Sequence, residues 1–245
     1  MVASDHEKTE KLLDSRENLM RNSPSKSEKV LAGLRTICGM VAHLAAVAFT
    51  GYIIYVSSPG SSLFSWHPTL MSLAFSFLMV EAILVFSPDS SLIAKASRKT
   101  KVRIHWLLQI SAIACGSLGF TAIVINKIQS GKEHFKSWHG TFGLITMIYS
   151  IVQASFGVLL LYPQVAKRWN WKLIQLKVYH ATFGLLGFTL ACITIVLSLY
   201  SNFVVANIKD LAWGFCFFCP MWCGFIVMNQ VTNTYLPITR RSAAL

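Results

Sequence analysis

Residues 138–161 read WHGTFGLITMIYSIVQASFGVLLL, an apolar stretch without a Lys, Arg, Asp or Glu. A bilayer core about 30 Å thick is crossed by a helix of roughly 20 apolar residues. Five more stretches on either side are similarly long and also lack Lys and Arg. The six predicted spans are Ile37–Val56, Trp66–Phe86, Ile104–Ile125, Trp138–Leu161, Val178–Leu199 and Leu211–Leu236. The sequence therefore predicts an all-α, six-helix transmembrane bundle.

The composition supports this class, because 54% of the 245 residues are hydrophobic and 13% are charged. Soluble domains carry about 25% charged residues. Residues 1–34 are polar and of mixed charge, lack the apolar core of a signal peptide, and are predicted to be a disordered tail. We expect the six-span domain over residues 35–236 and a C-terminal tail over residues 237–245.

The net charge of +12 is distributed in a way that indicates topology rather than nucleic-acid binding. The face on which the N-terminus lies carries 15 basic residues close to the spans, and the opposite face carries 4. The first group is Arg21, Lys26, Lys29, Arg35, Lys95, Arg98, Lys99, Lys101, Arg103, Lys167, Arg168, Lys172, Lys177, Arg240 and Arg241. The second group is Lys127, Lys132, Lys136 and Lys209. The positive-inside rule therefore predicts that both termini are cytosolic.

Four histidines stand at the second or third residue of four consecutive spans: His67, His105, His139 and His180. Consecutive spans run in opposite directions, so His67 and His139 are predicted at the non-cytosolic depth, and His105 and His180 at the cytosolic depth. A haem iron with two axial imidazoles needs such a pair on facing helices. The pattern predicts two haems bound by the central four helices.

The two histidine-bearing hairpins form a weak internal repeat. Trp66-His67-Pro68 opens one and Trp138-His139-Gly140 opens the other. Parallel repeats of this kind are a known membrane architecture. Small residues follow the histidines at helical spacing, and they favour either room for a porphyrin or close helix packing. They are Gly184, Gly187 and Ala191 after His180, Ala112, Gly116 and Gly119 after His105, and Gly143 after His139.

Two further ionisable residues lie within the spans. Counted at 100° per residue, Glu81 falls on the same helix face as His67 and close to the cytosolic depth. It is a candidate proton acceptor coupled to haem reduction, or a protonated carboxyl bonded to a neighbouring helix. His43 has no partner at its depth and is expected to have a hydrogen-bonded structural role.

The cysteines indicate no disulfide framework, because all six lie in spans or at the lipid boundary. Cys216, Cys219 and Cys223 share one helix face, a spacing that resembles a metal motif. No His or carboxylate stands near them to complete a site. We therefore expect them to be small buried hydrophobic residues.

At these histidines the sequence resembles the cytochrome b561 family, the ascorbate-linked transmembrane reductases. The matching stretches are Pro59–Pro68, which reads PGSSLFSWHP, Glu81–Pro88, and Leu176–His180, which reads LKVYH. The similarity runs from about residue 31 to residue 240. The resemblance implies two b-type haems, with His67 and His139 as one axial pair and His105 and His180 as the other.

The resemblance also implies electron flow from cytosolic ascorbate to monodehydroascorbate or ferric iron across the membrane. An endoplasmic reticulum or vesicle membrane is the expected location, and the sequence allows a homodimer. Better-known members read Ala-Leu-Leu-Val-Tyr-Arg at the cytosolic end of the second helix. This chain has Ser87 in place of the arginine. The loop cations Lys95, Arg98, Lys99, Lys101 and Arg103 are candidates to bind the donor anion in its place, or they serve topology alone.

Two other functions fit the residues without the resemblance. Paired membrane histidines also suit a proton or metal-ion transporter, although each pair lacks the further ligands of a tetrahedral zinc site. The chain could also be a haem-binding anchor subunit of a larger redox complex. An optical spectrum separates haem from zinc, since only haem gives a Soret band.

Overall fold

The computed structural model describes residues 26–162, 164, 168 and 171–243. Its long elements are α2 (Lys26–Ser57), α5 (Arg98–Gln129), α6 (Trp138–Leu161), α8 (Leu173–Ser198) and α10 (Asp210–Ala243). The second span is α3 (Trp66–Met71), η1 (Ser72–Leu78) and α4 (Met79–Leu84) in succession. With these three counted as one, six helices are long and apolar enough to cross a membrane, which confirms the predicted integral, multi-pass bundle.

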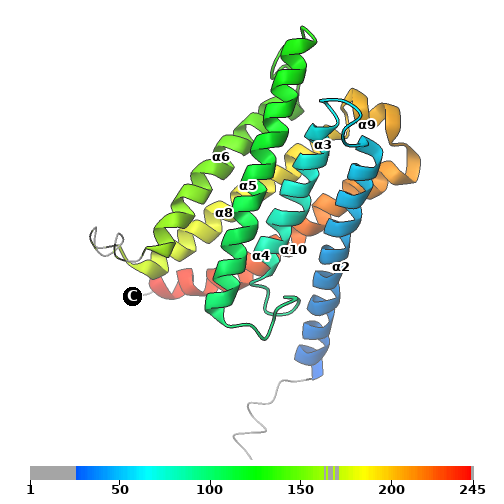
Figure 1. The fold of residues 1–245 in the computed structure, drawn as a ribbon. Helices are drawn as coiled ribbons and strands as arrows, with labels where there is room; N and C mark the ends of the chain where they lie inside the picture. The colour runs from blue at the N-terminus through cyan, green and yellow to red at the C-terminus, as the bar shows by residue number, and fades with distance from the viewer. Residues whose placement is uncertain (1–25, 163, 165–167, 169–170, 244–245) are drawn as a thin grey trace, which may run out of the picture.

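The second span, α5, α6 and α8 form the central part of the bundle, and α2 and α10 flank it (Figure 1). The second span packs along α5, and α6 packs along α8, so each pair of consecutive spans forms a hairpin. Helices α2 and α10 pack together, α2 against the second span and α10 against α8. The short helix α9 (Asn202–Asn207) lies on the face opposite to the start of α2, called here the far face.

The helices extend beyond the apolar runs at several ends. Helix α2 begins at Lys26, inside the segment 1–34 for which a tail is expected, because residues 26–34 contain good helix formers that continue the span. Helix α10 likewise runs to Ala243, past the expected end of its span at Leu236. Residues 1–25 lie outside the described part of the chain.

Serine caps fix where two histidine-bearing helices start. The Ser97 side chain accepts a hydrogen bond from the Thr100 backbone N–H at the start of α5. The Ser137 side chain accepts one from the Gly140 N–H at the start of α6. Such caps satisfy backbone donors that have no partner within the helix. His139 therefore lies in a first helical turn whose position is fixed.

The second span is not α-helical throughout. Residues Ser72–Leu78 form a π-helix between the α-helical segments α3 and α4. A π-helix bonds i to i+5 and advances by less than 100° per residue. The faces of α3 and α4 are therefore offset from those of one continuous α-helix.

Candidate functional site

The four helix-start histidines meet in two pairs, one near each face of the bundle. The ring centroids of His67 and His139 are 6.1 Å apart, and their planes cross at 71°. The ring centroids of His105 and His180 are 6.4 Å apart, and their planes cross at 82°. These are the two pairs that the directions of the helices predict.

Both separations suit two imidazoles on opposite sides of one metal ion. A metal–imidazole bond is about 2.0 Å long, and a ring nitrogen lies about 1.1 Å from its centroid, so the centroids of two imidazoles on opposite sides of a metal ion stand about 6.2 Å apart. The observed centroid distances lie on either side of this value. Within the described residues, no group of three or more His, Cys, Asp or Glu side chains could hold a metal ion. A pair of imidazoles supplies two ligands, so each pair suits a group that brings its remaining ligands with it, as a porphyrin does.

In the far-face pair, Nδ1 of each imidazole donates to a backbone carbonyl. His67 Nδ1 lies 3.1 Å from the Gly119 oxygen of α5. His139 Nδ1 lies 3.0 Å from the Thr194 oxygen of α8. Because a carbonyl oxygen only accepts, Nδ1 carries the proton in each neutral ring. The Nε2 lone pairs are therefore free to bind a metal.

The pair near the N-terminal face has one carbonyl partner and one amide partner. His105 Nδ1 lies 2.8 Å from the Ala82 oxygen of α4. The Gln153 side-chain Nε2 of α6 lies 3.1 Å from His180 Nδ1 and donates to the His180 backbone oxygen at 2.6 Å. Gln153 thus holds a site histidine in place. Nothing local to the sequence identifies these partners, because each lies on another helix.

Each histidine is held by the other helix of its own hairpin and faces a histidine of the other hairpin. Glycines allow this close approach. A Cβ on Gly119 would lie 3.0 Å from Leu70 Cβ, and one on Gly187 would lie 2.7 Å from the Tyr149 ring. A Cβ on Gly157 would lie 3.1 Å from His180 Cε1. These glycines therefore allow close packing around the histidines, and room for a porphyrin stays a prediction.

Glu81 reaches the expected depth but not the expected side. Its neighbour Ala82 bonds His105, which places Glu81 close to the N-terminal-face pair. Its carboxylate contacts His43 Nδ1 of α2, at 2.8 Å from each oxygen. The count of 100° per residue from His67 is wrong because it crosses the π-helix. His43 is hydrogen-bonded, as predicted.

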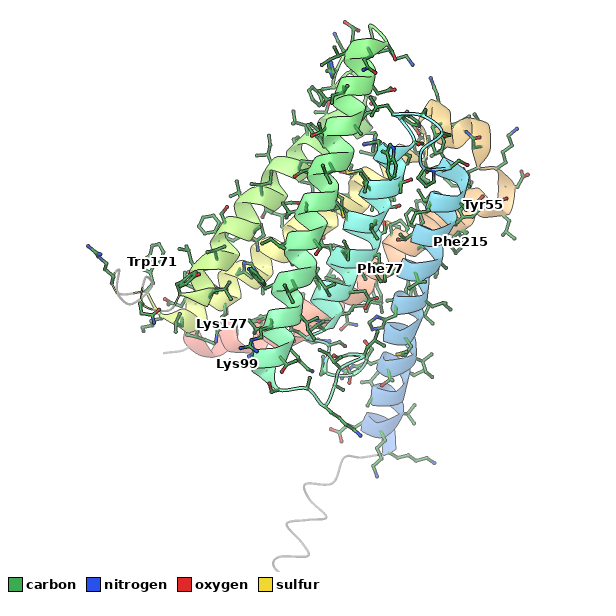
Figure 2. All side chains as sticks on the ribbon, in the orientation of Figure 1. Tyr55, Phe77, Lys99, Trp171, Lys177 and Phe215 are labelled. Carbon is green, nitrogen blue, oxygen red and sulfur yellow. The ribbon has the colours of Figure 1, made fainter. Side chains whose placement is uncertain are left out.

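One candidate donor-site cation, Arg98, contacts the histidine pair indirectly, through the Phe86 ring. The Arg98 guanidinium carbon is 5.7 Å from the centroid of the Phe86 ring, and that centroid is 5.3 Å from the His105 ring centroid. Figure 2 shows Lys99 at the same end of α5 as Arg98, and Lys177 at the matching end of α8. No hydrogen bond or ion pair in the described part of the chain connects Lys95, Lys101 or Arg103 to the histidine pair. Lys167 lies outside the described residues.

On the far face, Lys127 is the cation that sequence reasoning missed. It lies in the last turn of α5, at the far-face end of that helix. It also donates to the Glu133 backbone oxygen at 2.9 Å. From the sequence, Lys127 is expected only to contribute to the charge difference that sets topology, because its distance from the second hairpin depends on the fold.

Comparisons with known proteins identify the family of the chain. Residues 66–206 match the family model described as eukaryotic cytochrome b561. The chain is 45% identical to the transmembrane reductase CYB561D2 of Bos taurus and 45% identical to that of Homo sapiens, in each case over 89% of this chain and 97% of the relative. It is 28% identical to the probable ascorbate-specific transmembrane electron transporter 2 of Oryza sativa subsp. japonica, over 62% of each chain.

Proposed function

This chain belongs to the cytochrome b561 family, and from that premise we propose that it is a transmembrane reductase with two b-type haems. His67 and His139 would hold the far-face haem, and His105 and His180 would hold the other. The observation that carries the proposal is the pair of centroid separations, 6.1 and 6.4 Å, at opposite ends of one four-helix bundle.

The haems supply one-electron redox chemistry, and the protein orients and insulates them. The carbonyls of Gly119, Thr194 and Ala82 fix the tautomer and the ring orientation of three ligands. Gln153 fixes the fourth ring from the side of α6. Six apolar helices separate the two aqueous faces, so an electron crosses the membrane by passing from one haem site to the other.

Ascorbate on the cytosolic side is the proposed donor, and the N-terminal face is the cytosolic one. The excess of basic residues on that face supports this orientation. The similarity to the rice relative, a probable ascorbate-specific transmembrane electron transporter, supports an ascorbate-linked activity. Arg98 is the best-placed donor-binding cation, because it lies over Phe86 and Phe86 lies against His105. It could replace the arginine that is absent at Ser87.

Monodehydroascorbate or ferric iron in an anionic chelate is the proposed acceptor at the far face. The Lys127 ammonium supports this proposal, since it places a positive charge at the far-face end of α5. An anion approaching the far-face haem would therefore be attracted to the place where the electron leaves.

The test is the haem content and redox behaviour of the purified chain. We expect about two haems per chain by the pyridine haemochrome assay, low-spin six-coordinate spectra, and reduction of both by ascorbate. A chain that binds zinc but shows no Soret band would favour the transporter alternative. A chain with haem that cannot reduce a ferric chelate without added subunits would favour the anchor-subunit alternative.

A further inference from the structure

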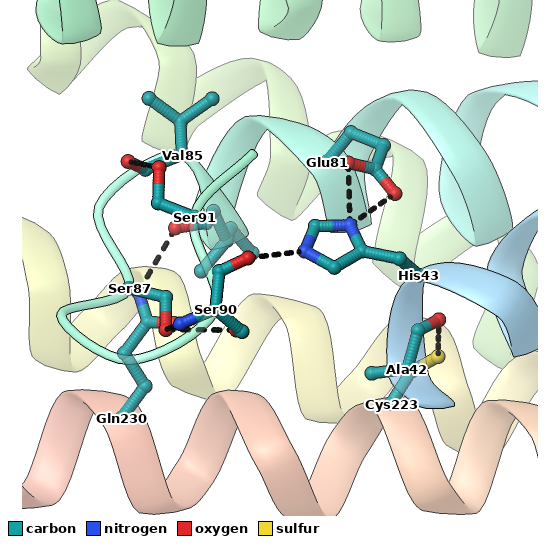
Figure 3. Close-up of polar contacts among 10 residues, drawn as sticks. Ala42, His43, Glu81, Val85, Ser87, Ser90, Ser91, Cys223 and Gln230 are labelled. Carbon is teal, nitrogen blue, oxygen red and sulfur yellow. Dashed lines mark hydrogen bonds and ion pairs between the residues drawn. The ribbon is translucent and has the colours of Figure 1, made fainter. Parts of the chain in front are cut away.

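One buried pair of ionisable side chains has no part in ligating the proposed haems. His43 of α2 lies between the Glu81 carboxylate and the backbone carbonyl of Ser90, as Figure 3 shows. The two side chains are only 8% and 12% exposed. No hydrogen bond in the described part of the chain joins either of them to the four helix-start histidines. Buried ionisable groups in membrane helices are costly, so this pair calls for a functional explanation.

The geometry fixes how many protons the pair holds. His43 Nε2 lies 3.0 Å from the Ser90 oxygen, which only accepts, so Nε2 carries a proton. His43 Nδ1 lies 2.8 Å from both Glu81 oxygens, so a single proton lies between the ring and the carboxylate. The pair is electrically neutral whether this proton is on nitrogen or on oxygen. Glu81 therefore retains capacity for one more proton.

The pair lies next to the proposed haem site of the N-terminal face. Ala82, the residue after Glu81, accepts the hydrogen bond from His105 Nδ1. A negative charge that arrives at this site acts on Glu81 through a medium of low dielectric constant, where charges interact strongly. Reduction of a haem adds one such charge. A proton taken up by the pair would neutralise it.

We propose that the His43–Glu81 pair is the proton acceptor coupled to reduction of the haem held by His105 and His180. This deepens the proposed function and rests on it. The enediol monoanion of the donor loses one electron and one proton and becomes the radical anion. The electron goes to the haem iron, and the proton goes to the Glu81 carboxylate. The resulting carboxyl lies beside the His43 imidazolium, so the charge of the pair changes from zero to +1.

The surroundings leave the pair as the main acceptor. On α10, the Cys223 thiol donates to the backbone oxygen of Ala42, the residue before His43. In the loop after α4, Asp89 precedes Ser90 in sequence. On α5, His105 already donates its Nδ1 proton to Ala82. No hydrogen bond or ion pair among the described residues links Cys223, Asp89 or His105 to His43 or Glu81.

The experiment is a spectroelectrochemical titration of the purified, haem-loaded chain across pH. In the parent, the midpoint potential of the N-terminal-face haem is expected to fall by up to about 59 mV per pH unit, which is a tenfold change in proton concentration converted for a one-electron couple. Glu81→Gln and His43→Gln should flatten this dependence. Asp89→Asn is the matched control, since it removes a nearby carboxylate that has no contact with His43, and it should keep the slope of the parent.

Redox-difference infrared spectroscopy supplies a second readout that does not depend on activity. Reduction of the parent should produce a protonated-carboxyl C=O band that is absent in Glu81→Gln. An equal pH slope and an unchanged band in Glu81→Gln would overturn the inference while the proposed function stands. A parent chain without bis-histidine haem would overturn the proposed function itself. Low-spin spectra in each variant establish that it has folded around its haems.

Discussion

The two far-face histidines each use their two ring nitrogens for different tasks. Nδ1 of His67 and of His139 donates to a carbonyl on the adjacent helix, which leaves Nε2 for the metal. This division fixes both the tautomer and the direction of the ring, and metal-binding histidines commonly need such outer partners. A side-chain substitution at a residue that supplies only its backbone oxygen therefore leaves the hydrogen bond to the histidine in place. A displacement of the helix that carries this oxygen would instead change the direction of the imidazole ring.

At the residue scale, we predict that Arg98→Gln slows reduction of the N-terminal-face haem by ascorbate roughly tenfold. A hydrogen bond to a charged group contributes about 1.5–3 kcal/mol, and tenfold corresponds to about 1.4 kcal/mol. Stopped-flow reduction at several salt concentrations measures the effect. The steering part should weaken as salt rises, because exposed charges are screened beyond about 8 Å at physiological ionic strength.

The control for this prediction is Arg103→Gln. Arg103 carries the same charge on the same helix, but five residues at about 100° each turn it well away from the Arg98 side. Arg103→Gln should therefore lose only the salt-dependent electrostatic attraction of ascorbate and keep the rate that remains at high salt. If both variants reduce as fast as the parent at every salt concentration, the loop cations serve topology alone and the donor binds elsewhere.

At the scale of elements, the second span contains both features that the sequence predicts and one that it does not. Its apolar length and the position of His67 are local properties, so the span and the histidine pairs followed from the sequence. The side of Glu81 did not, because seven residues from Ser72 to Leu78 are π-helical and change the phase between His67 and Glu81. The carbonyl partners and the Gln153 contact also could not be predicted, since they depend on how separate helices pack.

Helix α2 carries a second element-scale constraint at Gly39. A Cβ there would collide with the side chain of Ser90, whose carbonyl accepts from His43. We predict that Gly39→Ala destabilises the protein by about 1–3 kcal/mol through overpacking. The same change should displace the loop after α4 and weaken the His43–Ser90 bond. Thermal unfolding in detergent, followed by the haem absorbance, measures the loss.

Gly51→Ala on the same helix is the matched control. Nothing lies within 4 Å of a Cβ at Gly51. Alanine is the better helix former by about 1 kcal/mol, so this variant should be as stable as the parent or more so. Equal losses in the two variants would show that α2 tolerates no added methyl group anywhere, and that Ser90 is not the cause.

At the scale of the whole molecule, two similar hairpins face each other across the four-helix part of the bundle. The second span with α5 forms one hairpin, and α6 with α8 forms the other. Each contributes one histidine to each face, so neither hairpin alone completes a pair. This arrangement makes each haem site a contact between hairpins, and binding of haem should hold the two hairpins together.

The last prediction assigns each pair to one side of the membrane. In proteoliposomes with ascorbate at the N-terminal face, His105→Ala or His180→Ala should abolish fast haem reduction, because the entry haem is lost. His67→Ala or His139→Ala should leave fast reduction of one haem but stop electron delivery to an acceptor on the far side. In all four variants the haem content should fall from about two per chain to about one. His134→Ala is the control, since His134 lies in the far-face loop beside Phe135 and outside both pairs, and it should retain both haems.

Loss of the same haem in His67→Ala and His105→Ala would contradict the pairing. Fast reduction only from the far side would instead contradict the cytosolic orientation while leaving the pairs intact, because the rings stay 6.1 and 6.4 Å apart whichever face meets the donor.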